Sequence, residues 1–123
     1  MSTRTILICD DDHDSIFELE QGLTSSGFEV ISIQQAKELV STAENLKPAV
    51  VIVNPDMKGF NEHDICKHIK KGSNIPVMLI IQKNSTSRAQ IGDCDVDDVV
   101  TKPVEIGNLT TLISKHIAFY QQQ

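Results

Sequence analysis

The stretch Thr5-Ile6-Leu7-Ile8-Cys9, followed at once by Asp10-Asp11-Asp12, decides the fold that we predict for this chain. A short apolar run that is rich in β-branched residues, with no alternating polar positions, is typical of a strand buried on both faces of a parallel sheet. The run stops abruptly at three acids. The stretch therefore predicts a buried strand with carboxylates at its carboxyl end.

Four more apolar runs follow, and helical patterns separate them. The predicted strands are 5–9, 28–33, 49–53, 77–81 and 99–101. The predicted helices run from Ser15 to a stop at Gly27, from Ala36 to Lys47-Pro48, around 65–69, weakly around 87–91, and from Ile106 to Ile117. Such alternation with short links predicts right-handed crossovers and an α/β fold with a parallel sheet covered on both faces. The length of 123 residues suits one domain, 1–123.

The start of the first helix carries two signals. Ser15 with Glu18 three residues later forms a capping box, which predicts that the helix opens at Ser15. Asp12 and Asp14 lie at the start of this helix, where the helix dipole favours carboxylates.

Composition and charge exclude several classes of protein. The net charge of −6 does not suit a direct nucleic-acid binder or an anionic-membrane binder, since both need basic patches. No apolar run approaches the ~20 residues of a membrane span, and we expect no signal peptide. Three distant cysteines, Cys9, Cys66 and Cys94, form neither a disulfide framework nor a zinc motif. We therefore expect a cytoplasmic protein with reduced thiols.

Polar residues follow several of the predicted strands directly. Asp10 and Asp11 follow the first strand, Asn54 the third and Lys102 the fifth. Ligands of open α/β sheets bind beyond the carboxyl ends of the strands, so these side chains should converge on one patch. Asp97-Asp98 precedes its strand, and we interpret it as a solvated turn at the opposite edge.

These residues resemble a known family. The segments ILICDDD, VVIVNPDMKGFNEHDIC, IPVMLII and DDVVTKP are similar to those of response-regulator receiver domains, over essentially the whole chain. The resemblance implies a flavodoxin-like (βα)5 sheet with strand order 2-1-3-4-5. It also implies two-component or phosphorelay signalling, in which a histidine kinase supplies a phosphoryl group to an aspartate at the end of strand three, with Mg²⁺ bound by nearby acids.

Part of the family pattern is present. Asp10 and Asp11 match the metal-binding acids, and Lys102 matches the lysine that pairs with the phosphoryl group. Asp56 matches the position whose backbone carbonyl usually binds the metal. In the absence of a phosphoryl group, we expect Lys102 to pair with Asp10 or Asp11.

Three positions that carry the switch depart from the pattern. The phospho-acceptor position is Asn54, the hydroxyl position is Ile81 and the aromatic position is Val99. An amide is a far poorer nucleophile than a carboxylate and adds no charge to the metal site, although its oxygen still permits weak Mg²⁺ binding. The sequence therefore predicts a pseudo-receiver, not an enzyme, that acts by binding a protein such as a histidine kinase or an output protein. The expected surface is formed by the last predicted helix, which begins at Ile106, by the strand 99–101 and by the weakly predicted helix around 87–91.

Two alternatives stay open at this point. Asn54 could be an engineered change in a conventional phospho-accepting regulator, or Asp56 could accept the phosphoryl group instead. The fold could also bind a small ligand or a metal, although no glycine-rich phosphate loop follows the first strand.

Overall fold

The five strands form one parallel sheet in the order β2-β1-β3-β4-β5, as the resemblance implied. The computed structural model describes residues 4–62, 64–70, 74–84 and 96–121. The strands are β1 (Thr5–Cys9), β2 (Glu29–Ile33), β3 (Val50–Val53), β4 (Val77–Ile81) and β5 (Asp98–Thr101). Each lies within one residue of its predicted bounds.

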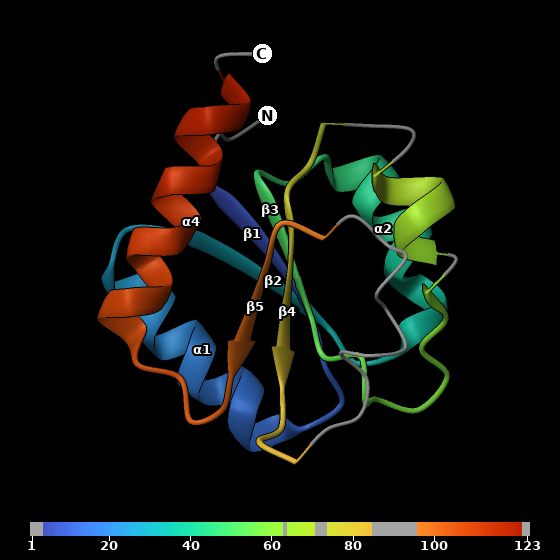
Figure 1. The fold of residues 1–123 in the computed structure, drawn as a ribbon, viewed down its shortest axis with the longest axis horizontal. Coiled ribbons are helices and arrows are strands. Elements are labelled where there is room, and N and C mark those ends of the chain that lie inside the picture. Colours follow the sequence, from blue (N-terminus) through green and yellow to red (C-terminus); the bar gives the residue numbers. More distant parts are fainter. Residues whose placement is uncertain (1–3, 63, 71–73, 85–95, 122–123) are drawn as a thin grey trace.

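Helices cover both faces of this sheet (Figure 1). Helices α1 (His13–Ser25) and α4 (Ile106–Gln121) lie on one face. The other face carries α2 (Leu39–Leu46), preceded by the 3₁₀ turn Ala36–Glu38, and the π-helix η2 (Asp64–Lys70). The predicted helix around 87–91 lies outside the described residues. The doubly wound α/β fold is therefore confirmed.

Burial explains why the central strands lack polar alternation. Every residue of β1, β3 and β4 is buried, because helices pack on both sides of these strands. Alternate side chains enter two separate cores. One lies under α1 and α4 and the other lies under α2 and η2.

The first helix begins earlier than the capping box predicted. Asp12 is the N-cap, and its Oδ1 accepts the backbone N–H groups of Asp14 at 3.1 Å and Ser15 at 3.3 Å. Aspartate is as good a cap as serine, and Asp14 in the first turn is favoured by the helix dipole. The prediction that Ser15 opens the helix is therefore wrong, and α1 starts at His13.

Close approach of α1 and α4 depends on a glycine. A Cβ atom at Gly22 would lie 2.5 Å from Cδ1 of Ile106, at the start of α4. Only a residue without a side chain fits this contact without displacing Ile106.

The acids before β5 do not form a solvated turn. Asp97 binds Nζ of Lys70 at 2.6 Å and the hydroxyl of Tyr120 at 2.5 Å, and it also accepts the backbone N–H of Val77 at 2.7 Å. Asp98 belongs to β5 and lies 3.1 Å from Nε2 of His116. The solvated-turn interpretation is therefore wrong. We call the three residues Lys70, Asp97 and Tyr120 the basal cluster.

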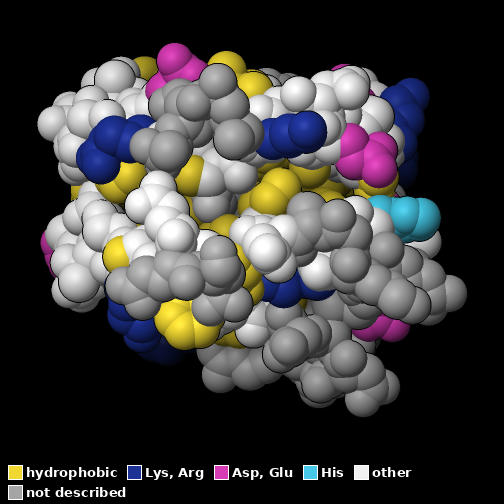
Figure 2. Space-filling model, turned by 90° about the horizontal axis from the view of Figure 1, so that it is seen from above, with side chains coloured by type: hydrophobic (Ala, Val, Ile, Leu, Met, Phe, Trp, Pro, Cys, Tyr) yellow, Lys and Arg dark blue, Asp and Glu magenta, His cyan; other side chains and the backbone are white. Residues whose placement is uncertain are grey.

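The basal cluster lies at the edge where the strands begin. Figure 2 looks onto this edge, and the acidic side chains visible there lie near the rim of the view. The Asp97 side chain is 14% exposed, and its hydrogen bonds join η2, β4 and α4. This edge therefore ties helices to strands, whereas the convergent polar residues lie at the opposite edge.

Candidate functional site at the carboxyl edge of the sheet

Asp10 and Asn54 meet at the carboxyl ends of β1 and β3. The register aligns Cys9 with Val53, so the residues that follow these strands emerge side by side. Nδ2 of Asn54 donates to Oδ1 of Asp10 at 3.0 Å. Asp10 is 2% exposed and Asn54 is 7% exposed, so this is a buried hydrogen bond to a carboxylate. Such charge-assisted bonds are stronger than bonds between neutral groups.

Lys102 reaches the same acids from the end of β5. Its Nζ lies 3.6 Å from Oδ2 of Asp10 and 3.8 Å from Oδ2 of Asp12. The predicted pairing with Asp10 is confirmed, and the second carboxylate is that of Asp12 and not that of Asp11. Asp11 is exposed, and its Oδ2 accepts the backbone N–H of Lys58 at 3.2 Å.

The Lys102 ammonium is shielded without being hydrogen-bonded. Its Nζ is closed off from solvent, and within the described part of the chain it has no partner at hydrogen-bonding distance. The whole side chain is only 15% exposed. Attraction to two carboxylates at longer range therefore holds a charge that is largely removed from water.

Of the other predicted site residues, one lies on a loop and two pack in the core. The exposed Asp56 lies on the loop after β3, and its backbone N–H donates to Oδ1 of Asn54 at 2.9 Å. Ile81 is 4% exposed at the end of β4, and Val99 packs against the same core under α2. Where the family pattern has a hydroxyl and an aromatic ring, this chain has aliphatic packing.

Whether Mg²⁺ fits this site depends on the donor atoms that face it. Mg²⁺ binds oxygen ligands in near-octahedral geometry. Asp10 and Asp11 supply carboxylates, but Asn54 presents its NH₂ group to Asp10 and its oxygen to Asp56. Among the residues that the structure describes, no three His, Cys, Asp or Glu side chains are grouped to hold a metal. The residues present do not fit a tightly bound ion.

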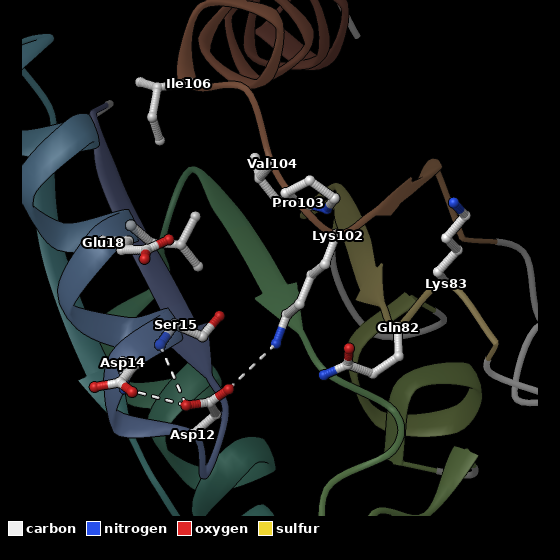
Figure 3. Close-up of a pocket in the computed structure, with 11 residues that line it drawn as sticks. Asp12, Asp14, Ser15, Glu18, Gln82, Lys83, Lys102, Pro103, Val104 and Ile106 are labelled. Atoms are coloured by element: carbon white, nitrogen blue, oxygen red, sulfur yellow. Dashed lines mark hydrogen bonds and ion pairs between the residues drawn. The ribbon is translucent and has the colours of Figure 1, made fainter.

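A cavity of about 440 Å³ opens beside this site, between α1 and the ends of β4 and β5 (Figure 3). Asp12, Asp14 and Glu18 line its α1 side, while Lys83 and Lys102 line the opposite side. The sequence analysis did not predict this cavity. Its walls come from the segments 12–19, 82–83 and 102–106, which are far apart in the sequence, so no local pattern indicates it.

Cys9, which directly precedes Asp10, is buried and unreactive. Burial raises the pKa of its thiol to about 12, and the nearby charge of Asp10 adds to the effect. Its Sγ contacts Sδ of Met57 at 3.5 Å inside the core. Because the thiolate is the reactive form, Cys9 is a packing residue and not a nucleophile.

Comparison with known proteins identifies the family. The chain matches the response regulator receiver domain family over residues 6–114. It is 33% identical over 99 residues to the uncharacterized transcriptional regulatory protein YrkP of Bacillus subtilis (strain 168), covering 80% of this chain and 42% of that protein. The chain therefore belongs to the response regulator receiver family, whose domains are typically signalling modules that interact with histidine kinases.

Further relatives agree on the family and on the fold. The DNA-binding response regulator MtrA of Mycolicibacterium smegmatis is 27% identical over 99 residues, covering 80% of this chain and 43% of that protein. A CheY-like receiver domain from Methanospirillum hungatei JF-1 superposes with a TM-score of 0.86 at 20% identity, covering 98% of both chains. The chain spans less than half the length of the curated relatives named here.

The comparisons bear on the exclusion of nucleic acid, and the helices bear on membrane crossing. One relative is named as DNA-binding, so the exclusion of nucleic acid that we drew from the net charge is not supported. Within the described ranges, no helix combines the length and the apolar character that crossing a membrane requires.

Proposed function

We propose that this chain is a pseudo-receiver, a single receiver module (1–123) of the cytoplasm that signals by binding a protein and not through an aspartyl phosphate. The observation that carries the proposal is the state of Asn54, whose amide nitrogen is hydrogen-bonded to Asp10 at the acceptor position. An amide has no free carboxylate oxygen to attack phosphorus. Ile81 supports the same proposal, since no hydroxyl is available there to bind a phosphoryl oxygen.

Mg²⁺ has a minor place in this proposal. Asp10 and Asp11 would supply carboxylates and Asp56 a backbone carbonyl, which amounts to a weak site at most. The family's use of Mg²⁺ at the phosphorylation site supports the choice of residues. No step of the proposed function depends on the ion.

Phosphorylation is tested directly by mass. The chain is incubated with acetyl phosphate and MgCl₂, and the mass of the intact protein is measured by mass spectrometry before and after treatment with mild base. We expect no stoichiometric adduct on the wild-type chain. A base-labile phosphoryl adduct would contradict the proposal. Its loss in Asp56→Asn would then assign it to Asp56, the alternative acceptor. Asn54→Asp, treated alongside, shows whether the rest of the site still supports transfer.

The proposed partner surface includes α4 and β5. Phe119 projects from α4 with 57% of its surface exposed. A histidine kinase or output protein that binds this face should bind equally before and after acetyl phosphate treatment, and Phe119→Ser should weaken the complex. Phe17→Ser is the matched control, because Phe17 is 64% exposed on α1. Binding that requires acetyl phosphate, or that is lost with Phe17→Ser alone, would contradict this part of the proposal.

A further inference from the structure

The buried amide of Asn54 can lie in only one orientation. Nδ2 donates to Oδ1 of Asp10, and Oδ1 accepts the backbone N–H of Asp56 at 2.9 Å. Turned over, the amide would set its oxygen against a carboxylate and its NH₂ group against another donor. Both contacts would be repulsive, so the hydrogen-bond network fixes the observed orientation.

In this orientation Asn54 offers hydrogen atoms where a divalent cation would need an oxygen ligand. Oδ1 of Asp10 already accepts two N–H groups, one from Asn54 and one from the backbone of Asp12 at 3.1 Å. Oδ2 of Asp10 faces the Lys102 ammonium. The chain therefore surrounds this carboxylate with two donors and one positive charge of its own.

We infer that Asn54 and Lys102 together take the place of a divalent cation, so that the resting site is held in a single arrangement without metal. The inference shares Asn54 with the proposed function but concerns the metal and not the phosphoryl group. With a carboxylate at position 54, two buried like charges would face each other across the 3.0 Å now spanned by the hydrogen bond. Such a pair is unstable unless a proton or a cation lies between its members.

Metal binding to the native chain has to work against this network. An ion that recruited the Asn54 oxygen would turn the amide over and break its bonds to Asp10 and to the Asp56 N–H. It would also have to share Asp10 with the Lys102 ammonium, at 3.6 Å from the same carboxylate. These competing contacts predict that the native chain does not bind Mg²⁺ at millimolar concentrations.

Thermal unfolding with and without MgCl₂ tests the inference. The wild-type chain, Asn54→Asp and the control Asn45→Asp are melted in EDTA and in rising MgCl₂. The control adds the same charge at an exposed position of α2. The Tm of the wild type and of the control should not respond to Mg²⁺. Asn54→Asp should melt below the wild type in EDTA and should rise with the logarithm of Mg²⁺ concentration once the site saturates. A wild-type Tm that rises with Mg²⁺ as steeply as that of Asn54→Asp would overturn the inference.

A second measurement does not depend on the variant folding well. The side-chain NH₂ of Asn54 gives its own cross-peaks in a ¹H–¹⁵N spectrum of the wild-type chain. We expect these peaks to stay in place as millimolar MgCl₂ is added. Peaks that move along a saturation curve would show that the amide rearranges around the ion, and the inference would be wrong. Neither result bears on phosphorylation, since an adduct at Asp56 would end the proposed function while leaving the metal response as predicted here.

Discussion

Changing Tyr120 to Phe should loosen the end of α4 without touching the carboxyl edge of the sheet. The Tyr120 hydroxyl donates to Oδ1 of Asp97 at 2.5 Å and accepts from Nζ of Lys70 at 2.7 Å. Phenylalanine keeps the ring, which packs edge-on against Phe119 with centroids 5.6 Å apart. The substitution therefore removes two hydrogen bonds and little apolar contact.

The size of the effect follows from the partners. Each bond joins the hydroxyl to a charged group, and such bonds contribute about 1.5–3 kcal/mol. The two are not additive, because Lys70 and Asp97 stay bonded to each other at 2.6 Å when the hydroxyl is lost. Because Tyr120 is only partly buried, water replaces part of these bonds, and we expect a loss of about 1–2 kcal/mol in the free energy of unfolding. An unfolding entropy of about 2.1 cal/mol/K per residue converts this to a Tm lower by roughly 4–8 °C for 123 residues.

Circular dichroism melts and urea titrations measure this loss. The control is Ser114→Ala, which removes an exposed hydroxyl from the same helix and should change the free energy of unfolding by less than about 0.5 kcal/mol. A Tyr120→Phe chain that melts with the wild type, or a control that loses as much, would refute the role given to the basal cluster.

The same variant should reveal the pH dependence of the cluster. Burial by itself raises the pKa of the Asp97 carboxyl. The hydrogen bonds from Lys70, Tyr120 and the Val77 N–H outweigh burial and hold the pKa below its ordinary value of 3.8. A group with a lowered folded pKa stabilises the fold above its unfolded pKa, and that stabilisation is lost as the pH falls through the folded pKa. The difference between the wild type and Tyr120→Phe should therefore be full at neutral pH and should shrink below pH 3.8. A difference that grows toward acid would contradict this assignment.

Two further predictions concern packing and reactivity. Gly22→Ala places a methyl group against Ile106 and should lower the free energy of unfolding by about 1–3 kcal/mol in urea titrations. The loss should largely disappear in an Ile106→Ala background, and equal losses in both backgrounds would argue against the contact. In a chain with Cys66→Ser and Cys94→Ser, Cys9 should react with iodoacetamide at pH 8 about a thousandfold more slowly than a thiol of pKa 9.0, because its pKa is about 12. Labelling at an ordinary rate would contradict the burial of this thiol.

The strands could be predicted from the sequence because their signal is local. Short, continuous apolar runs such as Thr5–Cys9 and Val77–Ile81 are compatible with few structures other than a buried strand. All five predicted strands are present. The meeting of Asp10 with Lys102 was also predictable, since parallel strands bring their carboxyl ends to one edge. The strand order itself came from the family resemblance and not from the pattern of apolar residues.

The basal cluster could not be predicted in this way because its contacts are distant in the sequence. Asp97 lies 27 residues from Lys70 and 23 residues from Tyr120, and next to a short strand it looks like an ordinary turn residue. The prediction that α1 opens at Ser15 was wrong for a different reason. Asp12 and Ser15 are both good N-cap residues three positions apart, and the residue pattern alone does not decide between them.

The three departures from the family pattern make physical sense as a set. If no aspartyl phosphate forms at position 54, as we propose, a hydroxyl at position 81 would have no phosphoryl oxygen to bind. Ile81 and Val99 pack against one core, and a buried hydroxyl without a partner there would cost about 1–3 kcal/mol. Aliphatic side chains convert the same space into favourable packing. Loss of the acceptor therefore favours loss of the hydroxyl. An aromatic side chain on strand five would then have no switching role, because no phosphoryl group would trigger its change of rotamer. A chain altered only to block phosphorylation would need the first change alone, so the linked set supports a receiver whose resting arrangement is its working one.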